Sequence, residues 1–131
     1  MLKPEGRLVI ANLDWVPWED NVVAATEALI LEHNPEWTLA GSDGLPTHHV
    51  PDVQRAGFVG LETFSYDLDL TYTHEAWRGR IRASAGVAAT LDGPATEQFD
   101  SELRALLAES FPSDPLAVPH RIFVLTARLA K

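Results

Sequence analysis

Cysteine is absent from the 131 residues of this chain. Its absence excludes a disulfide framework, a zinc ribbon and a thiol nucleophile, and it fits a reducing compartment. The sequence also lacks an apolar run near the roughly 20 residues that a membrane-spanning helix needs. It shows no signal-peptide pattern at its start. We therefore expect a cytoplasmic protein that has no membrane partner.

Phosphate-binding loops are missing as well. The eight glycines form neither a G-x-G-x-x-G nor a Walker A motif, so no loop of this chain is expected to cradle a phosphate. Positive charge is scarce, because 10 Lys and Arg stand against 19 Asp and Glu, which gives a net charge of -9. That field repels a phosphate backbone, so we expect no nucleic-acid partner.

The apolar pattern predicts a single α/β domain over residues 1–131. Two continuous apolar runs predict interior strands, and one strictly alternating run predicts an edge strand. The strands should therefore lie in the order first, third, second. Helical spacing and capping residues predict about four helices. We expect strands at 7–13, 61–72 and 121–128, and helices at 21–33, 51–56, from Thr73 onward, and 94–110.

Two local patterns make sharper predictions. In the second strand, Phe64 and Tyr66 alternate with Ser65 and Asp67. The aromatic face should be buried and the other face wet. Gly57 follows a short helix and is expected to adopt the left-handed conformation that commonly ends helices.

Polar residues close the first strand and form the first candidate site. Asn12, Asp14 and Trp15 stand where the strand should end, and ligands in open α/β sheets bind beyond the carboxyl ends of strands. The alternative interpretation is a turn shaped by Asn12 and Asp14, with Trp15 and Trp18 in the core.

Arginines supply a second candidate site on the helix that Thr73 opens. Arg78 and Arg82 share one face of that helix, whereas Arg80 does not. Arginine binds carboxylates and phosphates in a bidentate manner, so this face could contact an anionic substrate group. The alternative is a solvated helix that pairs with acidic residues of the chain itself.

Other candidate motifs lead nowhere. His74-Glu75 lacks the second histidine of a zincin, because position 78 is arginine. His48 and His49 with Asp52 have the chemistry of metal ligands, but adjacent histidines in a loop are commonly solvated, and we expect no metal. Ser65 and Ser84 have no recognisable catalytic partners in the sequence, so no catalytic residue is assigned.

Three passages resemble one known family. Residues 2–10, LKPEGRLVI, resemble the entry to the fifth strand of class I S-adenosylmethionine (SAM)-dependent methyltransferases, with Glu5 in place of a usual glycine. Residues 53–58, VQRAGF, resemble the step before the sixth strand. Residues 72–84, YTHEAWRGRIRAS, are similar to a helix inserted after that strand in a type-11-like bacterial subgroup. The order and spacing of the passages strengthen the resemblance.

The resemblance implies the C-terminal half of a Rossmann-like methyltransferase sheet, with the last strand antiparallel between the other two. The glycine-rich cofactor loop and the acid that holds the ribose would lie upstream. SAM is therefore the implied cofactor, but this chain alone is not expected to bind it and is expected to be inactive by itself. The chain would keep the side of the site that binds a small-molecule acceptor. The substrate-binding residues implied are Asn12, Asp14, Trp15, Trp77, Arg78 and Arg82.

Two further expectations complete the hypothesis. A sheet cut beside its first strand would leave a free edge, which invites pairing with another chain. We therefore expect a homodimer or a complex with a missing N-terminal half. The alternative function is a stand-alone α+β module, derived from the same fold, that encloses a small ligand with Trp15, Trp37 and Trp77. A fragment without activity is a third possibility.

Overall fold

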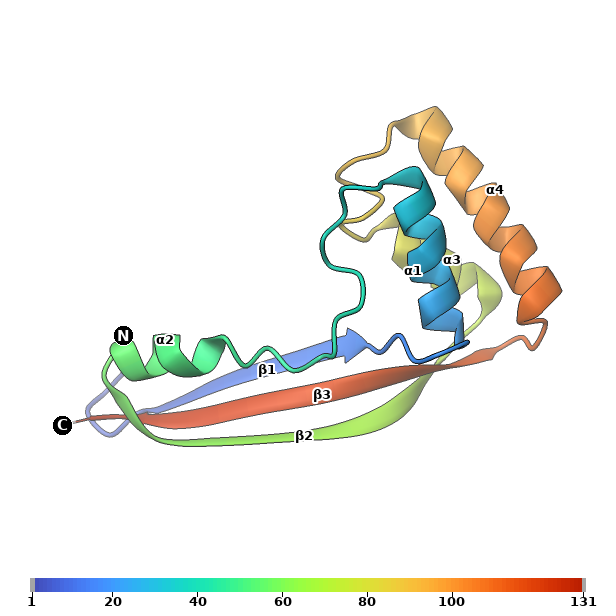
Figure 1. The fold of residues 1–131 in the computed structure, drawn as a ribbon. Coiled ribbons are helices and arrows are strands. Elements are labelled where there is room, and N and C mark those ends of the chain that lie inside the picture. Colours follow the sequence, from blue (N-terminus) through green and yellow to red (C-terminus); the bar gives the residue numbers. More distant parts are fainter. Residues whose placement is uncertain (1, 131) are drawn as a thin grey trace. The chain divides into compact units, whose positions relative to one another are not determined.

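The computed structural model describes residues 2–130, which form three strands and four helices (Figure 1). The chain divides into two compact units, which are described separately. Of the described residues, the sheet unit comprises 2–15, 44–68 and 120–130, and the helical unit comprises 16–43 and 69–119. The elements are β1 (Arg7–Trp15), α1 (Val22–His33), α2 (His49–Arg55), β2 (Phe58–Tyr72), α3 (His74–Arg82), α4 (Gly93–Ser110) and β3 (Leu116–Leu129).

The strand order is β1-β3-β2, and β1 pairs with β3 in the antiparallel sense. This confirms the predicted order, the antiparallel last strand and the mixed α/β class. The reason for the order is visible in burial, because alternate residues of β3 are almost fully buried, whereas no residue of β2 is. The central position therefore belongs to the most buried of the three strands.

One face of the sheet carries the core of the sheet unit, and we call it the covered face. Val53 of α2 packs there on Phe123, Leu125 and Ala127 of β3. Six partly buried apolar residues surround them: Leu8, Ile10, Leu45, Val50, Phe58 and Leu61. The antiparallel register explains this, since Leu8 and Ile10 lie directly opposite Ala127 and Leu125 and so point to the same side.

The turn after α2 has the predicted conformation. Gly57 has a φ of 90°, and its N–H donates to the carbonyl of Gln54 over 3.0 Å. A left-handed residue without a side chain ends the helix here. Phe58 then returns to the core beneath α2. The start of the second strand is therefore fixed by local chemistry, three residues before the predicted Leu61.

The aromatic face of β2 is exposed, and the prediction of its burial is wrong. Phe64 and Tyr66 are 55% and 52% exposed. Leu61 and Asp67 mark the covered face of β2, because Leu61 packs into the core and Asp67 bonds Arg121. Phe64 and Tyr66 therefore point to the opposite side. Within the described part of the sheet unit α2 is the only helix, and it lies on the covered face.

In the helical unit, α4 packs against both α1 and α3. Each helix begins at a residue whose side chain accepts a backbone N–H of the first turn: Asn21 for α1, Thr73 for α3 and Asp92 for α4. Such caps satisfy donors that have no partner inside the helix. The buried layer is formed by Ile30, Trp77, Ile81, Phe99, Leu103 and Leu107, all with 0% exposure. No described helix is long and apolar enough to cross a bilayer.

Candidate functional site

The first predicted group lies inside β1 and not beyond its end, because the strand continues to Trp15. Asn12 lies opposite Phe123, Asp14 opposite Arg121 and Trp15 opposite His120. These three residues, which we expected beyond the end of the strand, therefore belong to the paired region of β1 and β3. Asn12 and Asp14 are partly exposed, whereas Trp15 is 9% exposed.

A row of charged side chains crosses the covered face near the C-terminal end of β1. Each of the three strands contributes one: Asp14 of β1, Arg121 of β3 and Asp67 of β2. Arg121 is the centre of the row. Its Nε and Nη2 donate to the two carboxylate oxygens of Asp67 over 2.6 and 3.0 Å, and Asp14 lies directly opposite it on β1. The bond from Arg121 lowers the pKa of Asp67 below its ordinary value. Asp67 therefore holds the guanidinium of Arg121 with both of its carboxylate oxygens.

Gly44 completes the surroundings of this arginine. It is buried with a φ of 68°, and a β-carbon there would lie 3.2 Å from the side chain of Arg121. The backbone can approach the arginine only because no side chain intervenes. Sequence reasoning missed both Arg121 and Asp67 as site residues, although the alternation in β2 placed Asp67 opposite to the aromatic side chains.

The second predicted group is joined by an acid that the sequence did not reveal. Arg78 donates from Nε and Nη2 to Asp100 of α4 over 3.0 and 2.6 Å, and Arg82 donates from Nη1 over 2.6 Å. Both arginines therefore share a face, as predicted. The hydrogen bond with Asp100 raises the pKa of Arg78, and those bonds lower the pKa of Asp100. An anionic ligand would have to compete with Asp100 or use the remaining N–H groups.

Trp77, the remaining member of the group, is completely buried. Its indole N–H donates to the hydroxyl of Thr26 over 3.2 Å, and its ring meets Tyr72 edge-on at 5.4 Å. The side chain thus joins α3 to α1 in the core of the helical unit. The structure places Asn12, Asp14 and Trp15 in the sheet unit and Trp77, Arg78 and Arg82 in the helical unit.

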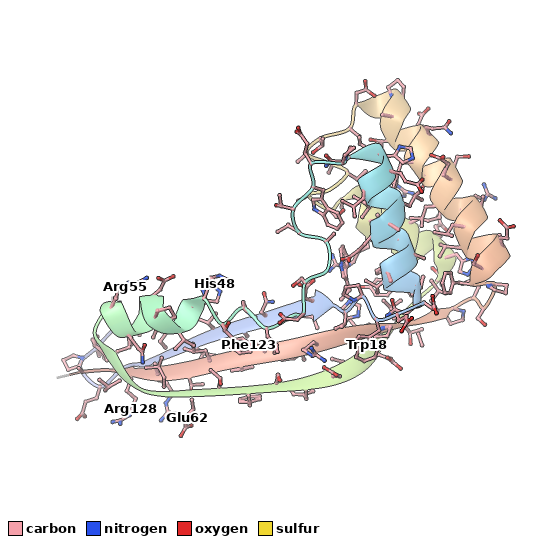
Figure 2. All side chains as sticks on the ribbon, viewed as in Figure 1. Trp18, His48, Arg55, Glu62, Phe123 and Arg128 are labelled. Atoms are coloured by element: carbon pink, nitrogen blue, oxygen red, sulfur yellow. The ribbon has the colours of Figure 1, made fainter. Side chains whose placement is uncertain are left out.

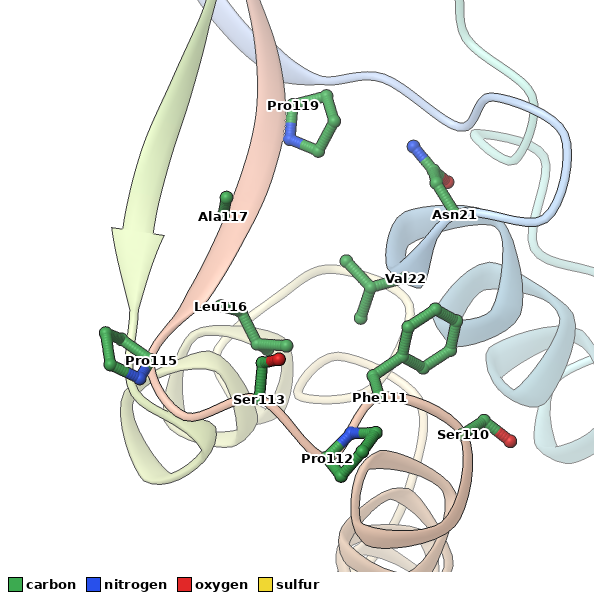
Figure 3. A pocket seen from close by; sticks show the side chains of 10 residues that line it. All are labelled: Asn21, Val22, Ser110, Phe111, Pro112, Ser113, Pro115, Leu116, Ala117 and Pro119. Carbon is green, nitrogen blue, oxygen red and sulfur yellow. The ribbon is translucent and has the colours of Figure 1, made fainter.

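A hollow of about 520 Å³ opens at the start of α1 in the helical unit (Figure 3). Its lining is mostly apolar, with the amide of Asn21 and two serine hydroxyls as polar groups. The lining residues are Asn21, Val22, Ser110, Phe111, Pro112, Ser113, Pro115, Leu116, Ala117 and Pro119. None of the tryptophans that we expected around a ligand belongs to it.

The amide of Asn21 is already engaged. Its Oδ1 accepts from the N–H of Ala24 and its Nδ2 donates to the carbonyl of Val16, both over 2.8 Å. The hollow therefore suits a small, largely apolar molecule more than a highly polar one. The proline-rich segment 111–119 gave no signal of this in the sequence, because we interpreted it as a connection.

Metal-binding groups are not gathered among residues 2–130, where no three histidine or acidic side chains come together. The imidazole rings of His48 and His49 are in contact, with centroids 4.1 Å apart and planes tilted by 45°.

Comparison with known proteins gives little further guidance. No protein-family profile and no curated protein sequence matches the chain. Among solved structures, the chain is similar to a "putative methyltransferase" from Bacillus halodurans C-125, with 14% sequence identity and a TM-score of 0.40. The match covers 99% of this chain and 58% of the other, so this chain spans little more than half of that protein. A likeness at this level says nothing about activity.

Proposed function

We propose that this chain is the C-terminal, substrate-side part of a class I SAM-dependent methyltransferase that acts on a small molecule. The observation that carries the proposal is the insertion of β3 between β1 and β2 in the antiparallel sense to β1. The three sequence passages imply this arrangement, and strand apolarity predicts the same order without them. The family resemblance and the apolar pattern of the strands thus predict the same strand order, which is the order of this sheet.

The residues of this chain do not fit the cofactor by themselves. None of its glycines forms a cofactor-binding loop between a strand and a helix. The hollow at α1 offers an amide that is already bonded and two serines, but no acid for ribose hydroxyls. A second part of the protein would have to supply the groups that hold SAM, the methyl donor of the family. Asn12, Asp14 and the row around Arg121 would hold the acceptor, since methyl transfer depends on positioning.

The edge of β1 supports a partner for this chain. In the order β1-β3-β2 of the described strands, β1 has a neighbouring strand on one side only, so its other side is an edge of the sheet. Such an edge pairs readily with a further strand. A cofactor-binding half pairing there would extend the sheet. A second copy of the chain is the other occupant that this edge admits.

Calorimetric titration with SAM tests the proposal. The chain alone should show no saturable heat up to millimolar SAM. The product of the same reading frame, extended upstream to include the cofactor-binding half, should bind SAM with micromolar affinity. Failure of the extended protein to bind would refute the methyltransferase assignment, whereas micromolar binding by the chain alone would refute its dependence on a partner.

A stand-alone module that binds a small ligand is the second candidate, and the hollow at α1 favours it. Anilinonaphthalene sulfonate is a suitable fluorescent probe for an apolar hollow. Ala117→Trp should fill the hollow and weaken probe binding at least tenfold. Ala108→Trp, on an exposed position of α4 outside the lining, is the matched control. Equal binding by both variants would dismiss the hollow as a ligand site.

A further inference from the structure

The side of the sheet opposite α2 carries an uncovered apolar surface, which we call the bare face. Its largest exposed residues are Val9, Leu13, Phe64 and Tyr66, which are 57%, 49%, 55% and 52% exposed. Val9 and Leu13 lie opposite Thr126 and Ile122 of β3, so all three strands contribute. Exposed apolar side chains are common singly, but a contiguous group rimmed by polar residues marks an interaction surface.

Charge is concentrated at one end of the bare face. Arg7 and Arg128 lie directly opposite each other on β1 and β3, and both are exposed. Like charges in directly opposite positions repel. Neither guanidinium forms an ion pair with a described side chain within 4 Å. The face is thus locally positive in a chain whose net charge is -9.

A small depression lies between these arginines. It has a volume of about 140 Å³ and is lined by Arg7, Gly60, Glu62, Thr126, Ala127 and Arg128. Figure 2 shows Glu62 and Arg128 on the side of the sheet away from α2. Gly60 has a φ of 62°, and a β-carbon there would lie 3.0 Å from Nη2 of Arg128. Glu62 offsets one of the two positive charges. One positive charge therefore remains at the depression for an added carboxylate.

We propose that the bare face binds an amphipathic α-helix from outside this chain, with a carboxylate at the end that enters the depression between Arg7 and Arg128. The dimensions fit one helix. Three strands about 4.8 Å apart span roughly 10 Å, which matches a helix diameter of about 10–12 Å. Val9 to Leu13 covers about 14 Å, the length of roughly nine helical residues.

A second copy of the chain fits this face less well. The face measures roughly 10 by 14 Å in plan, or about 140 Å², whereas a stable dimer buries about 800 Å² per partner. Two copies would also bring together net charges of -9 each, which repel. Glu62 offsets only one of the two arginines at the positive end of the face, so this end favours a partner that supplies a further acid.

The test uses a defined peptide and does not depend on the methyltransferase proposal. The probe is a 14-residue helix fixed by a lactam bridge on its polar side, with leucines at spacings i, i+3, i+4 and i+7 and one glutamate at one end of that stripe. A matched peptide carries a lysine in place of the glutamate. Titration into the labelled chain should shift the amide resonances of Val9, Leu13, Phe64 and Tyr66, and leave that of Val53 in place.

Two sets of variants define the expected outcome. Phe64→Ser with Tyr66→Ser should weaken binding at least tenfold. Trp18→Ser, which changes an aromatic residue of the helical unit that is 45% exposed, should not. Arg7→Glu with Arg128→Glu should weaken the glutamate peptide about two- to fivefold per charge and strengthen the lysine peptide correspondingly.

Three results would overturn the proposal. The first is the absence of resonance shifts on the bare face. The second is equal affinity for the two peptides, unchanged by the arginine substitutions. The third is concentration-dependent dimerisation in sedimentation velocity that the Phe64 and Tyr66 substitutions abolish, because a second copy would then be the occupant.

Discussion

Asp100 is the residue whose replacement should most weaken the helical unit through charge alone. Its carboxylate accepts three hydrogen bonds from two arginines of α3. The side chains of Asp100 and Arg78 are each 19% exposed, and that of Arg82 is 39% exposed. The bonds to Arg78 are therefore shielded from solvent, and the bond to Arg82 is only partly shielded.

Asp100→Asn keeps the size of the side chain and removes its charge. A hydrogen bond to a charged group contributes about 1.5–3 kcal/mol, and an exposed ion pair about 0–1 kcal/mol. The pair with Arg78 should dominate, and the bond to Arg82 should add little. We expect the free energy of unfolding to fall by about 2 kcal/mol.

Urea unfolding followed by circular dichroism at 222 nm measures this loss, because α1, α3 and α4 supply most of the helix and α2 has only 7 residues. Glu97→Gln is the matched control, an exposed acid on the same helix. Its effect should stay within about 0.5 kcal/mol. A change of the same size for both variants would refute the reasoning.

The pH dependence gives an independent test. The bond from Arg78, above all, lowers the pKa of Asp100 in the folded chain below its ordinary 3.8. A carboxyl group with a lowered folded pKa stabilises the fold above its unfolded pKa, and this contribution disappears as pH falls through the folded value. The difference between the parent chain and Asp100→Asn should be constant above about pH 5 and should shrink below about pH 4. A difference that persists unchanged into acid would contradict the assigned cause.

Two further substitutions test packing and capping in the helical unit. Gly86→Ala should lower the free energy of unfolding by about 1–3 kcal/mol, because its β-carbon would lie 2.8 Å from Ile30, whereas Gly93→Ala meets no atom within 4 Å and should be nearly neutral. Thermal unfolding of both variants would show this, and equal melting temperatures would contradict it. Asn21→Ala should lower the free energy of unfolding by about 1 kcal/mol, the usual loss for an N-cap. Asn21→Asp keeps the capping oxygen but loses the bond from Nδ2 to the carbonyl of Val16, so urea unfolding should place its stability between that of Asn21→Ala and that of the parent chain.

Local chemistry made much of the fold predictable. Thr73 caps its helix as predicted, Asn21 caps the helix that was expected to begin at residue 21, and Gly57 is left-handed where a helix had to end. Strand order also followed from sequence, because the degree of burial of a strand is recorded in how continuous its apolar run is. These features depend on few residues that are close in the chain.

Contacts between distant residues were not predictable. Asp100 lies 22 residues from Arg78 and 18 from Arg82, and Asp67 lies 54 residues from Arg121. No spacing rule connects residues so far apart. The predicted substrate-binding residues remain a prediction, since the pairing of β1 and the packing of α3 involve only contacts within the chain.

The third strand shows a different limit. We began it at Arg121, because the continuous apolar run of this strand starts at Ile122. β3 in fact begins at Leu116. Pro119 is accommodated because its carbonyl is the group used, accepting from the N–H of Val16 over 3.0 Å. The missing donor of a proline excludes only bonds in which its nitrogen takes part.

The exposure of Phe64 and Tyr66 is the most informative disagreement between sequence and structure. Strict alternation predicts that one side of β2 is covered, but it does not identify the covering element. The described helix of the sheet unit lies on the side of Asp67 and Phe123. The aromatic side chains therefore retain the pattern of a buried surface without a cover in the sheet unit. An element from outside the sheet unit would have to bury them, which is the role that the proposed helix would fill.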